Sequence, residues 1–289
     1  MPSVAFFYGK PMPVASLAHF DWVVVEAGNL DDIAPLQSAG ADVFSYVSVG
    51  EVEAWRNVPG VIQSKWLLGD NRAWNTKVVD LTHEGWKQYL LETQMASLWA
   101  KGYRGFFLDT LDSYQLAVTD AAGQAKQRRA LVEIVKSVAA RFPGAKLLVN
   151  RGFEILPDVA NLLSGVVAES LFCGWDPNTR QYRRVAESDR AWLLQRLHEA
   201  KDRYRLPVTV VDYVAPGDRE LARQTARRIA ALGFIPWVST PAMDVLGVGL
   251  IENVQRMLPH DSLGALRRPP YLVPMPWLMP VNQWETESF

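Results

Sequence analysis

The feature that most constrains this chain is a series of short apolar, β-rich runs bounded by Gly, Pro, Asn or Asp. Most of the runs are apolar at consecutive positions, which is typical of parallel strands that are covered on both faces. The eight runs are VAFFYG (4–9), WVVVEAG (22–28), DVFSYVSVG (42–50), GFFLDTL (105–111), KLLVNRG (146–152), GVVAES (165–170), PVTVVDY (207–213) and GFIPWVS (233–239).

Helical patterns lie between many of these runs. Residues 82–101 begin with a possible cap at Thr82 and end before Gly102. The other helices are predicted over 124–142, 187–205 and 218–232, with shorter ones over 30–39 and 153–163. Eight strands with intervening helices predict an α/β fold, a single-domain (β/α)8 TIM barrel. A doubly wound sheet is the alternative, but its Gly-rich first turn is missing, because the first turn reads YGKPMP.

Two stretches stand apart from the alternation of strands and helices. Residues 259–289 hold six of the chain's 18 prolines, which excludes a regular helix there. We therefore predict a barrel over residues 1–258, followed by a proline-rich C-terminal arm or linker over residues 259–289. Residues 51–83 follow the third strand, and we expect them to form a long loop that helps to build the site.

Charge and composition exclude several classes of function. Lys and Arg number 30 against 31 Asp and Glu, so we expect neither a nucleic-acid partner nor a polybasic membrane anchor. No apolar run approaches the roughly 18 residues of a membrane span, so no membrane insertion is predicted. The N-terminal MPSVAFFYGK lacks the pattern of a signal peptide. The four histidines are far apart in sequence, and we predict neither a metal site nor a cofactor.

The ends of the predicted strands carry polar side chains. The active site of a TIM barrel lies at the carboxyl ends of its strands, so these residues are the most informative of the chain. Nearly every run ends in a polar or ionisable residue directly after apolar positions. Together these ends predict a polar, acidic floor at one end of an apolar barrel, which favours a cationic or hydroxyl-rich substrate.

Asp109 on the fourth run and Glu169 on the sixth are the candidate catalytic residues. Two carboxylates in one cleft are the chemistry of glycoside hydrolysis. The more apolar surroundings of Glu169 favour a raised pKa and the role of general acid/base, which leaves Asp109 as the nucleophile. The separation of the carboxylates decides between retention and inversion, and the sequence leaves it open. Asp109 could instead cap the next segment or pair with Arg151.

The candidate substrate-binding residues are other strand-end residues and aromatic rings near the predicted mouth. Each of them alone is about as readily structural as functional, and a single aromatic ring is more often part of a core. They are Tyr8, Glu51, Asp112, Asn150, Arg151, Asp212, Tyr213 and Trp237.

Two rival functions are compatible with a barrel. A carbohydrate-binding protein without catalysis would keep the same acidic aromatic cleft but would not need the paired carboxylates. A phosphate-handling isomerase or aldolase would need Gly-rich loops after the last two strands or a strand-end lysine. The chain reads VDYVAPGD and WVSTPAMD at those loops, and Lys10 is its strand-end lysine. Glycoside hydrolysis is therefore the favoured function.

The motifs AFFYG, FDWVVVE, SYVSVGE, GFFLDTLD, LLVNRG, VAES and VDY follow one another over roughly residues 4–255. In this order they resemble glycoside hydrolase family 114. The resemblance implies a (β/α)8 barrel that cleaves α-1,4-linked, partly N-acetylated galactosamine polymers of the Pel exopolysaccharide type at internal bonds. It also implies that Asp109 and Glu169 are the catalytic pair.

The resemblance further implies a periplasmic or extracellular protein whose partner is a polysaccharide substrate. Exopolysaccharide-export proteins, or a linked metal-dependent deacetylase domain as in larger members, are the other partners that it suggests. This chain has too few clustered histidines for deacetylation, so we predict none.

Overall fold

The computed structural model describes residues 1–53, 61–251 and 271–274. Eight parallel strands pair side by side in chain order, and each coincides with one of the eight apolar runs, which confirms the predicted strands. The eight strands are β1 (Val4–Phe7), β2 (Trp22–Val25), β3 (Asp42–Ser48), β7 (Gly105–Asp109), β8 (Lys146–Asn150), β9 (Gly165–Glu169), β12 (Val208–Tyr213) and β13 (Ile235–Ser239).

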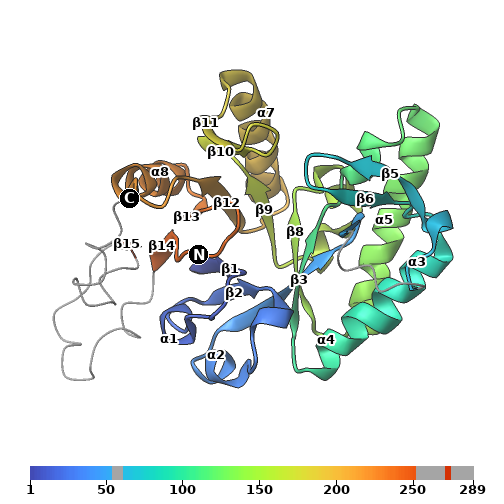
Figure 1. Cartoon of the computed structure of the whole chain (residues 1–289), viewed down its shortest axis with the longest axis horizontal. Coiled ribbons are helices and arrows are strands. Elements are labelled where there is room, and N and C mark those ends of the chain that lie inside the picture. Colours follow the sequence, from blue (N-terminus) through green and yellow to red (C-terminus); the bar gives the residue numbers. More distant parts are fainter. Residues whose placement is uncertain (54–60, 252–270, 275–289) are drawn as a thin grey trace.

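The sheet curls into a nearly closed barrel with helices on its outside (Figure 1). At the closing seam β1 contacts β13, and the Tyr8 N–H donates to the Met243 carbonyl at 2.7 Å. After β13 the chain returns as β14 (Val248–Ile251), which runs antiparallel to it, and β15 (Tyr271–Pro274) pairs with β14. The predicted (β/α)8 barrel is therefore confirmed as a class, although a strand, and no helix, follows the eighth parallel strand directly.

Part of the predicted C-terminal arm cannot be compared with the structure. Residues 259–270 and 275–289 lie outside the described residues. Between them, β15 contributes four residues of the proline-rich stretch to the edge of the sheet. The boundary at residue 258 stays a prediction.

The long helices lie where the periodicity places them. The first is continuous from α3 (Glu84–Gln88) through a π-turn (Tyr89–Met95) into α4 (Ala96–Ala100). The others are α5 (Ala121–Arg141), α7 (Glu187–His198) with a π-helical end (Glu199–Arg203), and α8 (Arg219–Ala231). Shorter pieces are α1 (Val14–Leu17), α2 (Ala34–Ser38) and α6 (Leu156–Val159), with 3₁₀ turns at Ala27–Asn29, Ser64–Trp66, Ser113–Leu116, Phe153–Ile155 and Ala160–Leu162. Among all of them, no helix in the described ranges is long and apolar enough to cross a membrane.

The cap of the first long helix differs from the prediction. The His83 side chain, and not that of Thr82, accepts the Gly85 N–H at 3.1 Å. The Thr82 hydroxyl donates instead to the Asp80 carboxylate at 2.7 Å. The helix therefore begins one residue later than predicted, because the imidazole nitrogen of His83 caps it in place of the Thr82 hydroxyl.

Two small antiparallel sheets follow the carboxyl ends of β3 and β9. Residues 51–83 do not form the expected loop. They contain β4 (Glu51–Glu53), β5 (Leu67–Asn71) and β6 (Thr76–Val79), which pair in the order β4-β6-β5. A hairpin of β10 (Cys173–Asp176) and β11 (Gln181–Arg184) follows β9. These added strands are only three to five residues long and mix polar with apolar residues, as in QYRR of β11. Their sequences therefore lack the apolar pattern from which a strand can be predicted.

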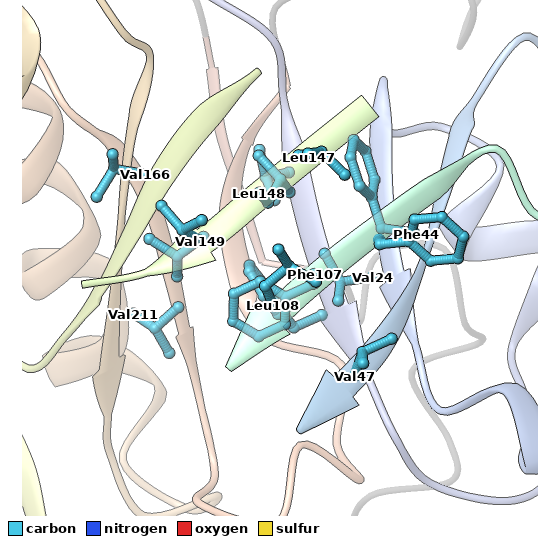
Figure 2. Packing of buried hydrophobic residues seen from close by; sticks show 14 of the residues in the cluster. Val24, Phe44, Val47, Phe107, Leu108, Leu147, Leu148, Val149, Val166 and Val211 are labelled. Atoms are coloured by element: carbon cyan, nitrogen blue, oxygen red, sulfur yellow. The ribbon is translucent and has the colours of Figure 1, made fainter. Parts of the chain in front are cut away.

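The pleat of the strands divides their side chains between the barrel interior and the helical layer. On β7, Phe107 packs inside the barrel with its ring centroid 5.4 Å from that of Phe6. Its neighbour Phe106 turns outward, and its ring lies 5.4 Å from Phe142 at the end of α5. Figure 2 shows Phe107 and Leu108 among the apolar side chains of neighbouring strands. Because side chains alternate, Asp109 shares the interior face with Phe107.

The turn after β7 depends on a glycine from a neighbouring strand end. Thr110 adopts φ +62°, which is unusual for a β-branched residue. Its hydroxyl accepts the Gly50 N–H at 2.9 Å and lies 2.9 Å from the Ser48 hydroxyl. A Cβ added to Gly50 would lie 2.1 Å from the Thr110 carbonyl oxygen. The close contact therefore requires glycine, and it holds the turn that follows Asp109.

We predict that Gly50→Ala destabilises the protein, because backbone atoms have to move apart to admit the methyl group. The expected loss in free energy of unfolding is about 1–3 kcal/mol, measured by urea denaturation. Gly217→Ala is the matched control, since nothing lies within 4 Å of its added Cβ. Equal stability of the two variants would contradict the assigned role of Gly50.

Candidate active site

The ends of three adjacent strands bring Asp109, Asn150 and Glu169 together. The Asn150 side-chain nitrogen donates to Asp109 Oδ1 at 2.8 Å and to Glu169 Oε1 at 3.0 Å. Because both hydrogen bonds start from the same nitrogen, the two carboxylate oxygens can be at most about 6 Å apart. The two acids that the sequence singled out therefore face one another across a single amide group.

Glu169 lies among donors and beside a second negative charge. Tyr213 donates its hydroxyl hydrogen to Glu169 Oε2, and Arg151 Nη2 donates to the Glu169 backbone carbonyl at 2.6 Å. Burial and then the charge of Asp109 raise the pKa of Glu169 to about 7, while Tyr213, Arg151 and Asn150 act in the opposite direction. A carboxyl group with this pKa is partly protonated at neutral pH, so it can both give and take a proton.

Asp109 has a different set of partners. Burial raises its pKa above the ordinary value, but hydrogen bonds from Asn150, the Thr110 N–H and Tyr46 act against that rise. The Thr110 N–H reaches the carboxylate from the left-handed turn after β7. The charge of Glu51 adds to the upward shift. Three donors that favour the ionised form suit a carboxylate that acts as a nucleophile.

Tyr8 and Tyr46 form an aromatic wall beside the two acids. Their ring centroids lie 5.5 Å apart at an interplanar angle of 60°. Burial, followed by the charges of Asp109, Glu169 and Glu26, raises the pKa of Tyr8 well above its usual range. Tyr8 is therefore a neutral phenol at physiological pH, and it lies close to the two acids that Asn150 bridges.

Glu51 and Asp112 occupy the same end of the barrel but differ in their freedom to meet a ligand. Glu51 is buried, and it accepts hydrogen bonds from Asn71 at 2.9 Å and from the Thr76 and Ser113 hydroxyls at 2.5 Å each. It ties the β4-β6-β5 sheet to the segment after β7. The Asp112 carboxylate is 41% exposed and lies 3.9 Å from Arg151 Nη1.

Asp212 lies on the opposite face of β12 from its neighbour Tyr213, away from the two candidate catalytic acids. Its side chain is fully buried and accepts the backbone N–H groups of three successive residues, Leu171, Phe172 and Cys173, at 2.6, 2.8 and 2.8 Å. Burial raises its pKa to about 6, and the three N–H donors oppose the shift. The predicted contact of Asp212 with substrate has no support in this geometry, because all of its acceptors face the segment that follows β9.

Trp237 is also enclosed. Its side chain has no exposed surface, and its ring lies 5.5 Å from that of Phe20 at 88°. A ring in that position fills the barrel and offers no face on which a sugar could stack. The strand-end pattern pointed to Trp237 because it stands two positions before Ser239, where one apolar run passes into polar residues.

Two contributors to the site have no role beside Asp109 in the sequence-based prediction, although Tyr46 is expected there as a ring that could line the cleft. Tyr46 lies within β3, two positions before the strand ends, and its hydroxyl acts on Asp109. Thr110 contributes a backbone N–H through its φ angle, which no side-chain pattern reveals. For Tyr46 the signal was available, because it stands two positions before Ser48 on the same strand and so lies on the same face, toward the barrel interior. In the described part of the chain, no three His, Cys, Asp or Glu side chains gather in a way that could hold a metal ion.

A barrel whose strand ends hold two carboxylates across one opening has the architecture of a glycoside hydrolase. The chain matches the model of Glycoside-hydrolase family GH114 over residues 4–254. It therefore belongs to family GH114 and is a glycoside hydrolase, which confirms the resemblance seen in the sequence.

Two solved structures are similar to this chain, one in sequence and fold and the other in fold alone. The glycoside hydrolase domain of PelA from Pseudomonas aeruginosa is 41% identical, with a TM-score of 0.79 over 86% of this chain and 98% of that chain. Ega3 from Aspergillus fumigatus, solved in complex with galactosamine, shares the fold at 18% identity, with a TM-score of 0.55 over 83% of this chain and 91% of that one.

Curated relatives are more distant. Uncharacterized proteins from Methanocaldococcus jannaschii and Deinococcus radiodurans are 23% and 24% identical over 72% and 78% of this chain. The matched region spans 64% of the length of the first relative and 75% of the second.

We predict that Asp212→Asn lowers the free energy of unfolding by about 1–3 kcal/mol, because an amide cannot accept all three N–H groups. Urea denaturation measures the change. Asp112→Asn, at an exposed carboxylate of the same mouth, is the control and is expected to stay within about 0.5 kcal/mol of wild type. An Asp212 variant as stable as this control would show that the three hydrogen bonds do not hold the segment.

Proposed function

We propose that this chain is an endo-acting hydrolase of α-1,4-linked, partly N-acetylated galactosamine polysaccharide of the Pel type. Membership of GH114 and the 41% identity to the PelA hydrolase domain support the substrate class. The observation that carries the catalytic assignment is the amide of Asn150, which donates to Asp109 and Glu169 at once.

The separation of the two acids favours a retaining mechanism. Retaining enzymes hold their carboxyl groups about 5–5.5 Å apart, and inverting enzymes hold them about 6.5–9.5 Å apart. The two bridged oxygens lie at most about 6 Å apart, a spacing that supports the retaining arrangement more than the inverting one. This geometry supports a covalent glycosyl-enzyme intermediate.

The two acids take separate roles in each half of the reaction. In the first half, an oxygen of Asp109 bonds to the anomeric carbon while Glu169 gives its proton to the departing glycosidic oxygen. In the second half, water attacks the same carbon, Glu169 takes the water proton, and the bond to Asp109 breaks. The pKa of about 7 for Glu169 and the three donors around Asp109 support this division.

The charge of the floor supports a substrate that carries amines. The carboxylates of Glu26, Glu51, Asp109 and Glu169 all act on the pKa values of floor residues, whereas Arg151 is the cation that acts on Glu169. A negative potential in a confined opening attracts protonated amino groups of deacetylated galactosamine units. Tyr8, Asn150, Arg151 and Tyr213 are the residues placed to contact the sugar at the cleavage point, with Asp112 at the rim.

We further propose a periplasmic or extracellular location for this activity, by analogy with the family resemblance. Exopolysaccharide-export proteins, or a deacetylase domain joined through residues 259–289, are the proposed partners. The PelA hydrolase domain is similar over 98% of its own length, so residues 1–258 are the proposed catalytic unit.

The test of this function is hydrolysis of a partly deacetylated α-1,4-galactosamine oligomer, followed by mass spectrometry. Wild type is expected to cleave internal bonds, and Asp109→Asn and Glu169→Gln to lose at least about a hundredfold in rate. Glu133→Gln is the matched control, because Glu133 is an exposed carboxylate on α5, and it should keep the activity of wild type. Proton NMR of the first product should show the α-anomer. A β-anomer would overturn retention, and intact oligomer with wild type would overturn the substrate.

The pH dependence provides an independent check of the roles. Glu169 has to be protonated in the free enzyme, so kcat/KM is expected to fall as pH rises through about 7. Protonation of Asp109 causes the acid limb, which should lie above the ordinary value of 3.8. Arg151→Gln removes a cation that lowers the pKa of Glu169, so the alkaline limb should move to higher pH. An alkaline limb that stays in place in this variant would contradict the assignment.

A further inference from the structure

A pocket of about 380 Å³ lies away from the catalytic pair. It opens between the β10–β11 hairpin, the first turns of α7 and one face of α8. Figure 1 shows the hairpin beside α7, above the strands of the barrel. The pocket volume lies in the range of about 300–1,000 Å³ that is typical of small-molecule sites.

Four arginines from three different elements line this pocket. They are Arg183 and Arg184 on β11, Arg190 on α7 and Arg228 on α8. The guanidinium carbon of Arg228 lies 3.9 Å from the ring centroid of Phe172, and that of Arg190 lies 5.8 Å from the same ring. Stacking on a ring restrains the plane of a guanidinium group and leaves the N–H donors at its edge free for a ligand.

The positive charge of the pocket is only partly balanced. Arg190 pairs with Glu187. Within the described ranges, Arg184 and Arg228 take part in no ion pair. The carboxylate that lines the pocket is Asp218, and it already accepts the Leu221 N–H at 3.1 Å as the cap of α8. Guanidinium groups with unused donors therefore gather around Asp218, and the buried carboxylate of Asp212 is a second negative charge that interacts with Arg228.

The rest of the lining adds flat and apolar surface. The Tyr182 ring on β11 is 38% exposed and lies 4.9 Å from that of Trp175. Phe172 and Leu221 add apolar surface to the lining. An aromatic face beside charged donors is suited to a sugar-sized ring that carries an anionic group.

The sign of this pocket is opposite to that of the catalytic mouth. Arginines repel the protonated amines of the proposed substrate, so a cationic polysaccharide has no reason to bind there. A different ligand class is required. Bidentate arginine contacts are the preferred partners of phosphate and carboxylate groups.

We propose that this pocket binds a small organic anion, namely a sugar-sized molecule that carries a phosphate or a carboxylate. Arg184 and Arg228 hold the anionic group, and the exposed ring of Tyr182 packs against the carbon skeleton. The site is separate from Asp109 and Glu169, although Tyr213 lines the pocket and also donates to Glu169.

Calorimetric titration of the full chain with four probes tests the proposal. Glucose 6-phosphate and glucuronate represent the two anionic groups, inorganic phosphate lacks the ring, and polyphosphate represents an anionic polymer. We expect one saturable site for at least one of the two sugar-sized probes, and tighter binding of that probe than of inorganic phosphate. Equal affinity for inorganic phosphate would overturn the sugar-sized ligand, and binding of polyphosphate alone would overturn the small one.

Arginine variants locate the binding. Arg228→Gln and the double variant with Arg184→Gln are expected to weaken binding by at least about tenfold. Arg227→Gln is the matched control, because Arg227 is exposed on the same helix and does not line the pocket. Circular dichroism checks that each variant is folded. Unchanged affinity in folded variants, or no saturable binding by wild type below about 10 mM, would overturn the proposal.

Discussion

The site depends on the register in which three parallel strands pair. Leu108 pairs with Val149, and Asn150 pairs with Val167, so β7, β8 and β9 end in a staggered row. The pleat then turns Asp109, Asn150 and Glu169 toward the same interior. A shift of one residue in either pairing would send an acid into the helical layer. The geometry of the candidate catalytic pair therefore depends on the backbone hydrogen bonds between the barrel strands.

The electrostatics of the pair follow from this shared position. Burial raises the pKa of both acids, and each negative charge opposes ionisation of the other, so hydrogen-bond donors decide which acid gives up its proton first. Asp109 receives donors from Asn150, Tyr46 and the Thr110 backbone, whereas Glu169 receives them from Asn150 and Tyr213. The left-handed turn at Thr110 thus acts on the pKa of Asp109, the proposed nucleophile, because it aims one of those donors at its carboxylate.

The barrel and its pair of acids could be predicted because their signals are local and periodic. Buried strands read as consecutive apolar residues, and each acid follows such a run directly. Side-chain roles were harder to predict. Glu51, Asp212 and Trp237 stand at or near strand ends as Asp109 does, yet each is buried among structural partners. The short strands at the mouth and the φ of Thr110 are set by tertiary contacts that no window of sequence contains.

Both small sheets at the mouth are fastened to the barrel by a buried carboxylate, Glu51 for the sheet after β3 and Asp212 for the segment that enters the hairpin after β9. Asp109, Asn150 and Glu169 come from the barrel strands β7, β8 and β9. The outer parts of the two small sheets can therefore vary in length or composition without a change in these three residues. Natural or engineered variation can thus reshape the surroundings of the mouth while Asp109, Asn150 and Glu169 keep their positions. In this architecture, the rim of the mouth and the pair of acids beneath it can evolve as separate modules.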